Sequence, residues 1–189
     1  MTQFKLLLLA CLAIILTACA TKVSSIKKEQ SVTLNQQKKE GFFLLAVDTN
    51  RQLQEIVISG PKSIALGKED LKKGNNYILL NLPEGEYTLS KIKFNKYARL
   101  KSFDDELWSF RVEKNAVSYV GHLSMKVYTY WWYTSYSQLE LLNNSSIALE
   151  YMENNFPTIL AGKKMQYAGP GKDNFFNVVR PQYNTTTGE

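Results

Sequence analysis

The feature that most constrains the fold is a run of twelve residues, AVSYVGHLSMKV (116–127), in which apolar and polar side chains alternate. The residues on one side of this run are Val117, Tyr119, Gly121, Leu123, Met125 and Val127. Mostly polar residues fill the other side, and Val120 is the exception. A period of two over this length is typical of a strand in a sheet with one face in water. The chain is therefore expected to contain such a sheet.

Other runs along the chain are also strand-like. They cover residues 42–48, 53–60, 76–82, 86–94 and 107–112. The first, FFLLAVD, is continuously apolar, as in a strand that is covered on both faces. Pro83 and Gly85 fit a type I turn between the third and fourth runs, which predicts a hairpin there, whereas residues 61–75 are expected to form a loop. Short strands at this spacing predict a mostly β chain folded as an antiparallel β-sandwich.

One helix is predicted, towards the C-terminus. Asn144 or Ser145 can cap it, and Ile147 and Tyr151 lie one turn apart on it. Pro157 is expected to end the helix, because proline lacks the backbone N–H and clashes with the preceding turn. The predicted fold is thus a β-sandwich with one short C-terminal helix.

The N-terminus resembles the signal of a bacterial lipoprotein. The apolar run LLLLACLAIIL is short for a membrane span, and Leu16, Thr17 and Ala18 lead to Cys19. In that family the peptidase cuts before the cysteine, whose thiol carries a diacylglyceryl group. The resemblance implies cleavage between Ala18 and Cys19, a membrane anchor of acyl chains on Cys19 and, because Ala20 is not an aspartate, the outer membrane.

These patterns divide the chain into four expected segments. They are a signal peptide (1–18), the lipidated cysteine with a flexible tether (19–40), the β-sandwich domain with its helix (41–165) and an irregular tail (166–189). The tether is expected because its sequence is polar and rich in lysine. As a coil it would hold the domain about 25 Å from the bilayer.

A second resemblance covers residues 42–127. LLNLPEGEYTLSKIKF (79–94), followed by VSYVGHL (117–123), is similar to small bacterial lipoproteins of the prealbumin-like or carboxypeptidase-regulatory-like sandwich type. Some sandwich lipoproteins of this kind are subunits of secretion machines. The resemblance implies a prealbumin-like sandwich and an accessory role, but no activity follows from such a fold.

Residues suited to catalysis are few. His122 is the one histidine, and Ser124 would lie roughly 6.5–7 Å from it along a strand, which is long for a hydrogen bond. Cys11 would leave with the signal and Cys19 would be acylated, so no thiol serves as a nucleophile. The acidic residues 104–106 lack the spacing and the glycine of a calcium loop. We expect no enzymatic activity, no cofactor and no metal site.

A basic stretch is the first candidate for binding. Its cationic residues are Lys91, Lys93, Lys96 and Arg99, in a chain of net charge +6. The stretch fits a solvated edge strand, and also contact with anionic lipid or glycan. Nucleic acid is not expected as a partner, because the resemblance of the N-terminus to a lipoprotein signal implies that the chain is exported.

An aromatic run, KVYTYWWYTSYSQ (126–138), is the second candidate. Its predicted binding residues are Tyr130, Trp131, Trp132, Tyr133 and Tyr136. The rings could form part of a core or an exposed surface, and the polar tips of Tyr and Trp together with the Thr and Ser neighbours favour a surface. We therefore predict a non-catalytic binding module on an envelope lipoprotein, an accessory or structural subunit that binds another protein. The alternatives are a carbohydrate or peptidoglycan binder and, third, an enzyme of unknown type.

Overall fold

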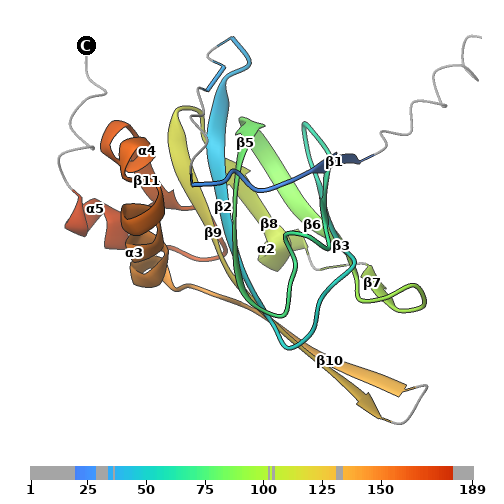
Figure 1. Ribbon diagram of the computed structural model, residues 1–189. Coiled ribbons are helices and arrows are strands. Elements are labelled where there is room, and N and C mark those ends of the chain that lie inside the picture. The colour runs from blue at the N-terminus through green and yellow to red at the C-terminus, as the bar shows by residue number, and fades with distance from the viewer. Residues whose placement is uncertain are drawn as a thin grey trace, which may run out of the picture.

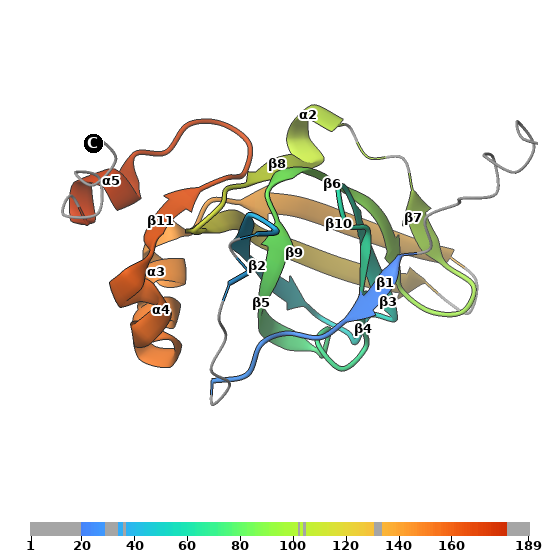
Figure 2. The ribbon, with the colours of Figure 1, turned by 90° about the horizontal axis from the view of Figure 1, so that it is seen from above.

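The computed structural model describes residues 20–28, 34–35, 37–101, 103, 105–130 and 134–180. Over these residues the chain is mostly β, as the sequence predicts. Two sheets pack face to face, and helices cover the free face of one of them (Figure 1). The view at right angles shows the same three layers in the same order (Figure 2).

The sheet farther from the helices is called the outer sheet. Its order is β1-β4-β3-β6-β7, and β8 pairs with β6 alongside β7. The strands are β1 (Thr21–Val23), β3 (Glu55–Ser59), β4 (Ile64–Gly67), β6 (Gly85–Lys93), β7 (Arg99–Lys101) and β8 (Ser109–Val112). A short helix, α2 (Asp105–Trp108), precedes β8. The loop expected over residues 61–75 is wrong for residues 64–67, which form β4 with Ile64 and Leu66 buried in the core, and for residues 74–75, which begin β5.

The sheet next to the helices is called the central sheet. Its order is β10-β9-β2-β5, and β11 pairs with β9 alongside β10. The strands are β2 (Glu40–Thr49), β5 (Gly74–Pro83), β9 (Ala116–Tyr130), β10 (Thr134–Leu142) and β11 (Lys164–Tyr167). β2 and β9 run parallel, as do β9 and β11 in this sheet and β1 and β4 in the outer one. The expectation of a purely antiparallel sandwich is therefore wrong.

The segment from Pro83 to Gly85 is a corner between the sheets. β5 pairs with β2, whereas β6 pairs with β3, β7 and β8, so the predicted hairpin of β5 and β6 is wrong. Gly85 has a φ of +143°, and a Cβ there would lie 2.6 Å from Cγ of Pro61. Glycine is required here because no other residue takes up this backbone conformation in so little space.

The main core lies between the two sheets, and β2 lines it on the side of the central sheet. Phe43, Leu45 and Val47 face the outer sheet, while Phe42 and Leu44 face the helices. Each of these side chains is buried. The predicted strand covered on both faces is confirmed, and each such residue contributes about 1.5–3 kcal/mol by leaving water.

β9 changes the face that it presents to the core. Its register with β2 shifts so that Leu44 pairs with Tyr119 and Leu45 with Gly121, which leaves Val120 as the extra residue of a β-bulge. Tyr119 faces the helices, whereas the apolar residues after the bulge face the outer sheet. The prediction of one apolar face along the whole strand is wrong. Val120, the exception in the alternation, marks the bulge.

The helical layer contains α3 (Ser145–Asn155), α4 (Pro157–Gly162) and α5 (Phe175–Val179). The predicted helix is confirmed as α3, but its buried stripe is Ala148 and Met152, and Ile147 is exposed. Asn144 is the N-cap residue, one of the two predicted, but its side chain makes no capping hydrogen bond. The side chain of Asn143 bonds the first helical residue, and its Oδ1 accepts from Ser145 N at 3.1 Å. Among the described residues, no helix combines the length and apolar character that crossing a bilayer requires.

The C-terminal part of the chain is more regular than predicted. Pro157 ends α3 and at once begins α4, where its missing N–H costs nothing. β11 joins the central sheet beside β9, and α5 packs on that sheet through Phe176. The irregular tail expected from residue 166 is therefore wrong for residues 166–167 and 175–179, whereas residues 168–174 between them form no helix or strand. Residues 181–189 of that tail lie outside the described part of the chain.

The N-terminal segment packs against both sheets. β1 pairs with β4, and Ile26 N donates to Leu79 O of β5 at 2.8 Å. Ser25 Oγ accepts from Leu79 N at 3.0 Å. The flexible tether expected over residues 19–40 is therefore wrong for residues 21–26. Pairing partners distant in sequence fix this segment, although its own composition is polar.

Candidate binding surfaces

The hairpin of β9 and β10 extends beyond the sandwich as a two-stranded ribbon, at the lower right of Figure 1. β2 pairs with β9 as far as Met125, whereas β10 pairs with β9 as far as Tyr130. Where β2 ends, a side-chain amide takes its place. Asn50 Nδ2 donates to Val127 O at 3.1 Å, and Val127 N donates to Asn50 Oδ1 at 2.9 Å. These two bonds close the edge of β9 at the base of the ribbon.

Two tyrosines of the ribbon form an exposed pair. Tyr128 is 47% exposed and Tyr136 65% exposed. They are direct cross-strand partners, with ring centroids 6.1 Å apart and ring planes at 25°. Because cross-strand partners share a face of the sheet, the two rings form one aromatic patch, here called the tyrosine pair. Exposed aromatic rings of this kind are enriched at protein interfaces.

The tyrosine pair overlaps only partly with the predicted aromatic site. Tyr136 is exposed, as a binding surface requires. The side chain of Tyr130 and all of Trp131, Trp132 and Tyr133 lie outside the described residues. Tyr128 was missed as a binding residue, because pairing it with Tyr136 requires the register of the hairpin, which the run of six rings does not give.

The two edges of the central sheet differ. At β5, Ser25 and Ile26 bond to the backbone of Leu79 and so cover the edge. At the other edge, β10 pairs only with β9 in the part of the chain that the structure describes. An edge strand of this length offers a row of backbone donors and acceptors to a further strand.

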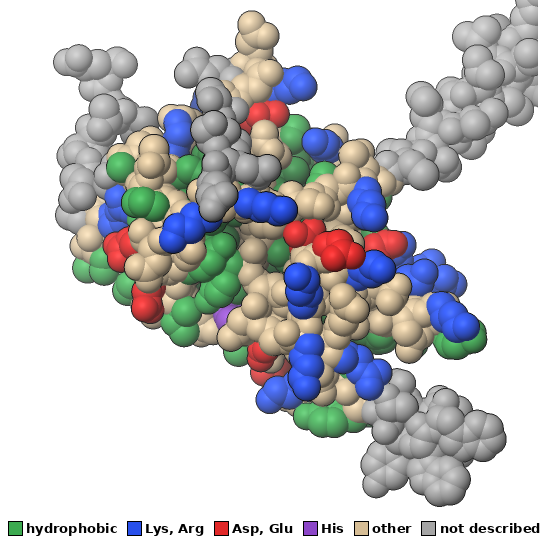
Figure 3. Space-filling view, viewed as in Figure 1, with side chains coloured by type: hydrophobic (Ala, Val, Ile, Leu, Met, Phe, Trp, Pro, Cys, Tyr) green, Lys and Arg blue, Asp and Glu red, His purple; other side chains and the backbone are tan. Residues whose placement is uncertain are grey.

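The predicted basic patch forms part of the exposed face of the outer sheet. Cross-strand partners form a row from Lys22 of β1 through Ala65 and Val57 to Lys91 and Lys101. A second row, two positions further along each strand and so on the same face, contains Gly67, Glu55, Lys93 and Arg99. Partners in a row share a face, so strand pairing gathers these cations on one surface, here called the basic face. In Figure 3, many Lys and Arg side chains lie on the side of β1, β3 and β7, with some Asp and Glu side chains between them.

Two details characterise the basic face. Lys91 Nζ lies 2.5 Å from Glu55 Oε1, so the carboxylate on the basic face forms an ion pair with one of the cations of that face. Lys96 lies in the loop between β6 and β7, with Nζ 4.6 Å from the centroid of the Tyr97 ring. That ring is 83% exposed. The structure thus brings together Lys91, Lys93 and Arg99 of the predicted patch, with Lys96 beside them.

An open groove lies on the same face, next to the N-terminal end of the described chain. Its volume is about 420 Å³, and Ala20, Lys22, Glu55 and Lys68 are among the residues that line it. The stem of Lys22 lies over Gly67, since a Cβ on that glycine would be 3.2 Å from Lys22 Cε. Lysine side chains therefore border the groove close to Ala20.

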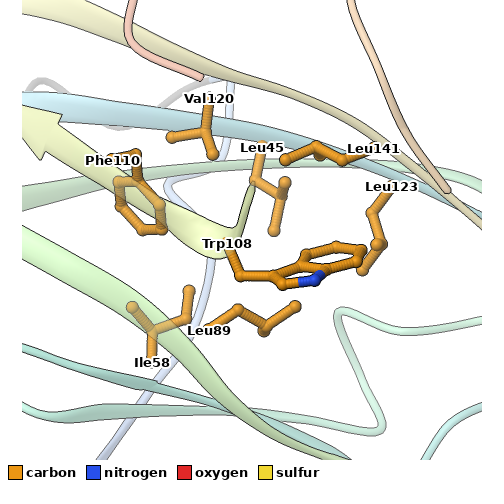
Figure 4. Close-up of a pocket in the computed structure, with 8 residues that line it drawn as sticks. All are labelled: Leu45, Ile58, Leu89, Trp108, Phe110, Val120, Leu123 and Leu141. Carbon is orange, nitrogen blue, oxygen red and sulfur yellow. The ribbon is translucent and has the colours of Figure 1, made fainter. Parts of the chain in front are cut away.

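A small apolar cavity lies between the sheets (Figure 4). The figure shows the indole of Trp108 lying among Leu45, Leu89 and Leu123, with the other lining side chains also aliphatic or aromatic. Its volume is about 20 Å³. That is roughly the room of one water molecule, and an apolar lining gives water no hydrogen-bond partner. The cavity is a packing gap and not a ligand site.

His122 lies on the helix-facing side of the central sheet and not on a fully solvated face. It is half-buried, and its ring meets that of Tyr77 edge to face, with centroids 6.4 Å apart. Burial lowers the pKa of His122, and the charge of Asp48 opposes that effect. Tyr77 in turn stacks on Tyr151 at 4.0 Å. No group of three His, Cys, Asp or Glu side chains in the described ranges could hold a metal ion.

Comparison with protein-family models, with curated proteins and with solved structures found no match to this chain.

Proposed function

We propose that this protein is a lipid-anchored envelope protein whose β-sandwich is a non-catalytic binding module for another protein of the envelope. In this proposal the chain is cleaved after Ala18, Cys19 carries the acyl chains, and the protein resides at the outer membrane as an accessory or structural subunit. The closer likeness to prealbumin-like lipoproteins stays a prediction.

The observation that supports the proposal best is the ribbon of β9 and β10. It projects from the body of the domain and carries the tyrosine pair, Tyr128 and Tyr136, in water. Two large rings exposed to water are unfavourable in free energy, because the transfer of apolar ring surface out of water is favourable. A partner that covers the rings removes that cost on binding.

The edge of β10 supports the same role. A partner strand added along residues 134–142 would extend the central sheet through backbone hydrogen bonds, while the tyrosine pair on the sheet face would select its side chains. At the opposite edge of the sheet, Ser25 and Ile26 already occupy the corresponding backbone positions of β5. We therefore place the partner at β10 and not at β5.

Photo-crosslinking in cells tests this proposal. A photoreactive residue is placed at Tyr128 and at Tyr136, with Glu153, an exposed position on α3, as the control. We expect a discrete heavier band from the two ribbon positions and not from the control. With the probe at Tyr128, the band should weaken in a Tyr136→Ala background and persist with Val178→Ala, a truncation of a comparably exposed side chain on α5.

The other outcomes are also informative. A folded protein that gives no band at either ribbon position contradicts the partner proposal. Binding to isolated peptidoglycan that depends on Tyr136 would then identify the ribbon as a carbohydrate-binding surface, the alternative function.

A further inference from the structure

The distance between the proposed anchor and the folded domain is short. Thr21 N donates to Ser63 O at 2.9 Å, and β1 is in register with β4 from this residue on. One residue, Ala20, separates Cys19 from Thr21, so two residue steps join them, and an extended chain spans roughly 3.3–3.6 Å per residue. If Cys19 carries the acyl chains, the edge of the outer sheet therefore lies within about 7 Å of it. This replaces the separation of about 25 Å that a flexible tether would allow.

The surface nearest to this edge is the basic face. Lys22 follows Cys19 by three positions and begins the row of partners that ends at Lys91 and Lys101. The helical layer lies on the opposite side of the molecule, beyond the central sheet (Figure 2). A domain attached at β1 can therefore turn this face, and not the helices, towards the bilayer.

The charges of the face suit an anionic surface. Its two rows contain five cations, namely Lys22, Lys91, Lys93, Arg99 and Lys101, and one carboxylate, Glu55, which is bonded to Lys91. Further along β6, Glu86 is bonded to Arg111 at 2.8 Å, so that pair adds no net charge. The face thus has an excess of positive charge directly beside the attachment point.

We propose that the basic face lies on the anionic phospholipid headgroups of the membrane that holds the anchor. This inference rests on the proposed lipidation of Cys19. Lys22 and Lys68 border the groove beside Ala20, which would receive a headgroup phosphate. Tyr97, with its exposed ring next to Lys96, would lie at the headgroup level, where tyrosine is enriched.

Lysine footprinting on the lipidated full chain tests the proposal. The purified protein is reconstituted into vesicles of phosphatidylcholine, alone or mixed with phosphatidylglycerol, and acetylated with a water-soluble reagent. We expect Lys22, Lys93 and Lys101 to react more slowly in the anionic vesicles, by a factor of about five, which corresponds to the attraction of one lysine to an anionic surface. Lys172, exposed near α5 in the helical layer, is the internal control and should react equally in both. Raised salt should abolish the difference, because it screens the attraction.

A charge-reversal variant makes the test specific. Lys93→Glu with Lys101→Glu should remove the protection of Lys22, whereas Lys114→Glu with Lys172→Glu, matched in charge but outside the two rows, should not. Equal reactivity of Lys22 in both vesicle types, or protection of Lys172 in its place, would overturn the proposal.

The mass of the N-terminal peptide separates the two hypotheses. Acyl chains on Cys19 without protection of Lys22 would refute the orientation alone. Absence of acyl chains would refute the anchor in the proposed function and, with it, the orientation that depends on it.

Discussion

The β-bulge in β9 should make Gly121 one of the positions least tolerant of a side chain. Its φ is +138°, a region that other residues rarely occupy, and a Cβ there would lie 2.8 Å from Leu141 Cδ1 and 3.2 Å from Leu142 O. The backbone strain alone costs about 1–3 kcal/mol. The leucine methyl can rotate away in part, but the carbonyl belongs to the paired β10 and must shift. We therefore expect Gly121→Ala to lower the free energy of unfolding by about 2–4 kcal/mol.

Two further glycines separate the contributions. Gly74 also has a positive φ, +98°, but a Cβ there meets nothing within 4 Å, so Gly74→Ala carries the strain without the clash. Gly162, at the end of α4, has neither, and its replacement by alanine should be neutral or stabilising by up to about 1 kcal/mol. Urea unfolding, followed by tryptophan fluorescence and circular dichroism, gives the three values under identical conditions.

The order of the three changes in the free energy of unfolding tests the separation of backbone strain from steric clash. Destabilisation should increase from Gly162→Ala through Gly74→Ala to Gly121→Ala. If Gly121→Ala equals Gly74→Ala, then β10 moves freely and the clash argument is wrong. If it equals Gly162→Ala, the bulge itself is wrong, and so is the account of how β9 changes its face.

Three further predictions concern side chains in the main core and between the central sheet and the helices. Burial lowers the pKa of His122, so the unfolded chain takes up a proton near pH 6.5 at a pH where the folded chain does not. The free energy of unfolding is therefore fully present above that pH and decreases as the pH falls below it. In urea unfolding between about pH 7 and 5.5, His122→Gln should remove the part of this decrease that His122 causes. A double-mutant cycle of Tyr77→Leu and Tyr151→Leu should give a coupling of about 0.5–1.5 kcal/mol, since the rings stack at 4.0 Å, and a coupling near zero would mean that they do not meet. Tyr87→Phe should cost about 1 kcal/mol in urea unfolding, because its hydroxyl donates to Pro83 O at 3.0 Å in a buried site; an unchanged free energy of unfolding would show that the bond contributes nothing.

The sequence alone determined the elements whose signal is local. Residues 42–48 are apolar at every position up to Asp48, and a strand between two layers is the arrangement that buries both of its faces. The helix at 145–155 was predicted at the correct place, because Asn144 before its start and Pro157 after its end are visible in the sequence, although the side chain of Asn144 makes no capping hydrogen bond. Such features depend on neighbours in the chain, which the sequence displays directly.

Only the tertiary structure decided which strands became partners. The corner at Pro83–Gly85 has the residues of a hairpin turn, yet β5 pairs with β2 and β6 pairs with β3. The bulge at Val120 likewise arises because β9 must cover the helices at one end and the outer sheet at the other. Pairing is a competition among all available edges, and no local pattern records its outcome.

The candidate surfaces show the same division. Lys91, Lys93, Lys96 and Arg99 stand close together in the sequence, so their clustering could be predicted, whereas Lys22 joins them only through β4 and β3. The pairing of Tyr128 with Tyr136 likewise required the register of the hairpin. Composition determined that this chain has cations and rings to present to a partner. The backbone hydrogen bonds between distant strands decided which of them share a face, because side chains on a sheet become neighbours through pairing and not through proximity in the chain.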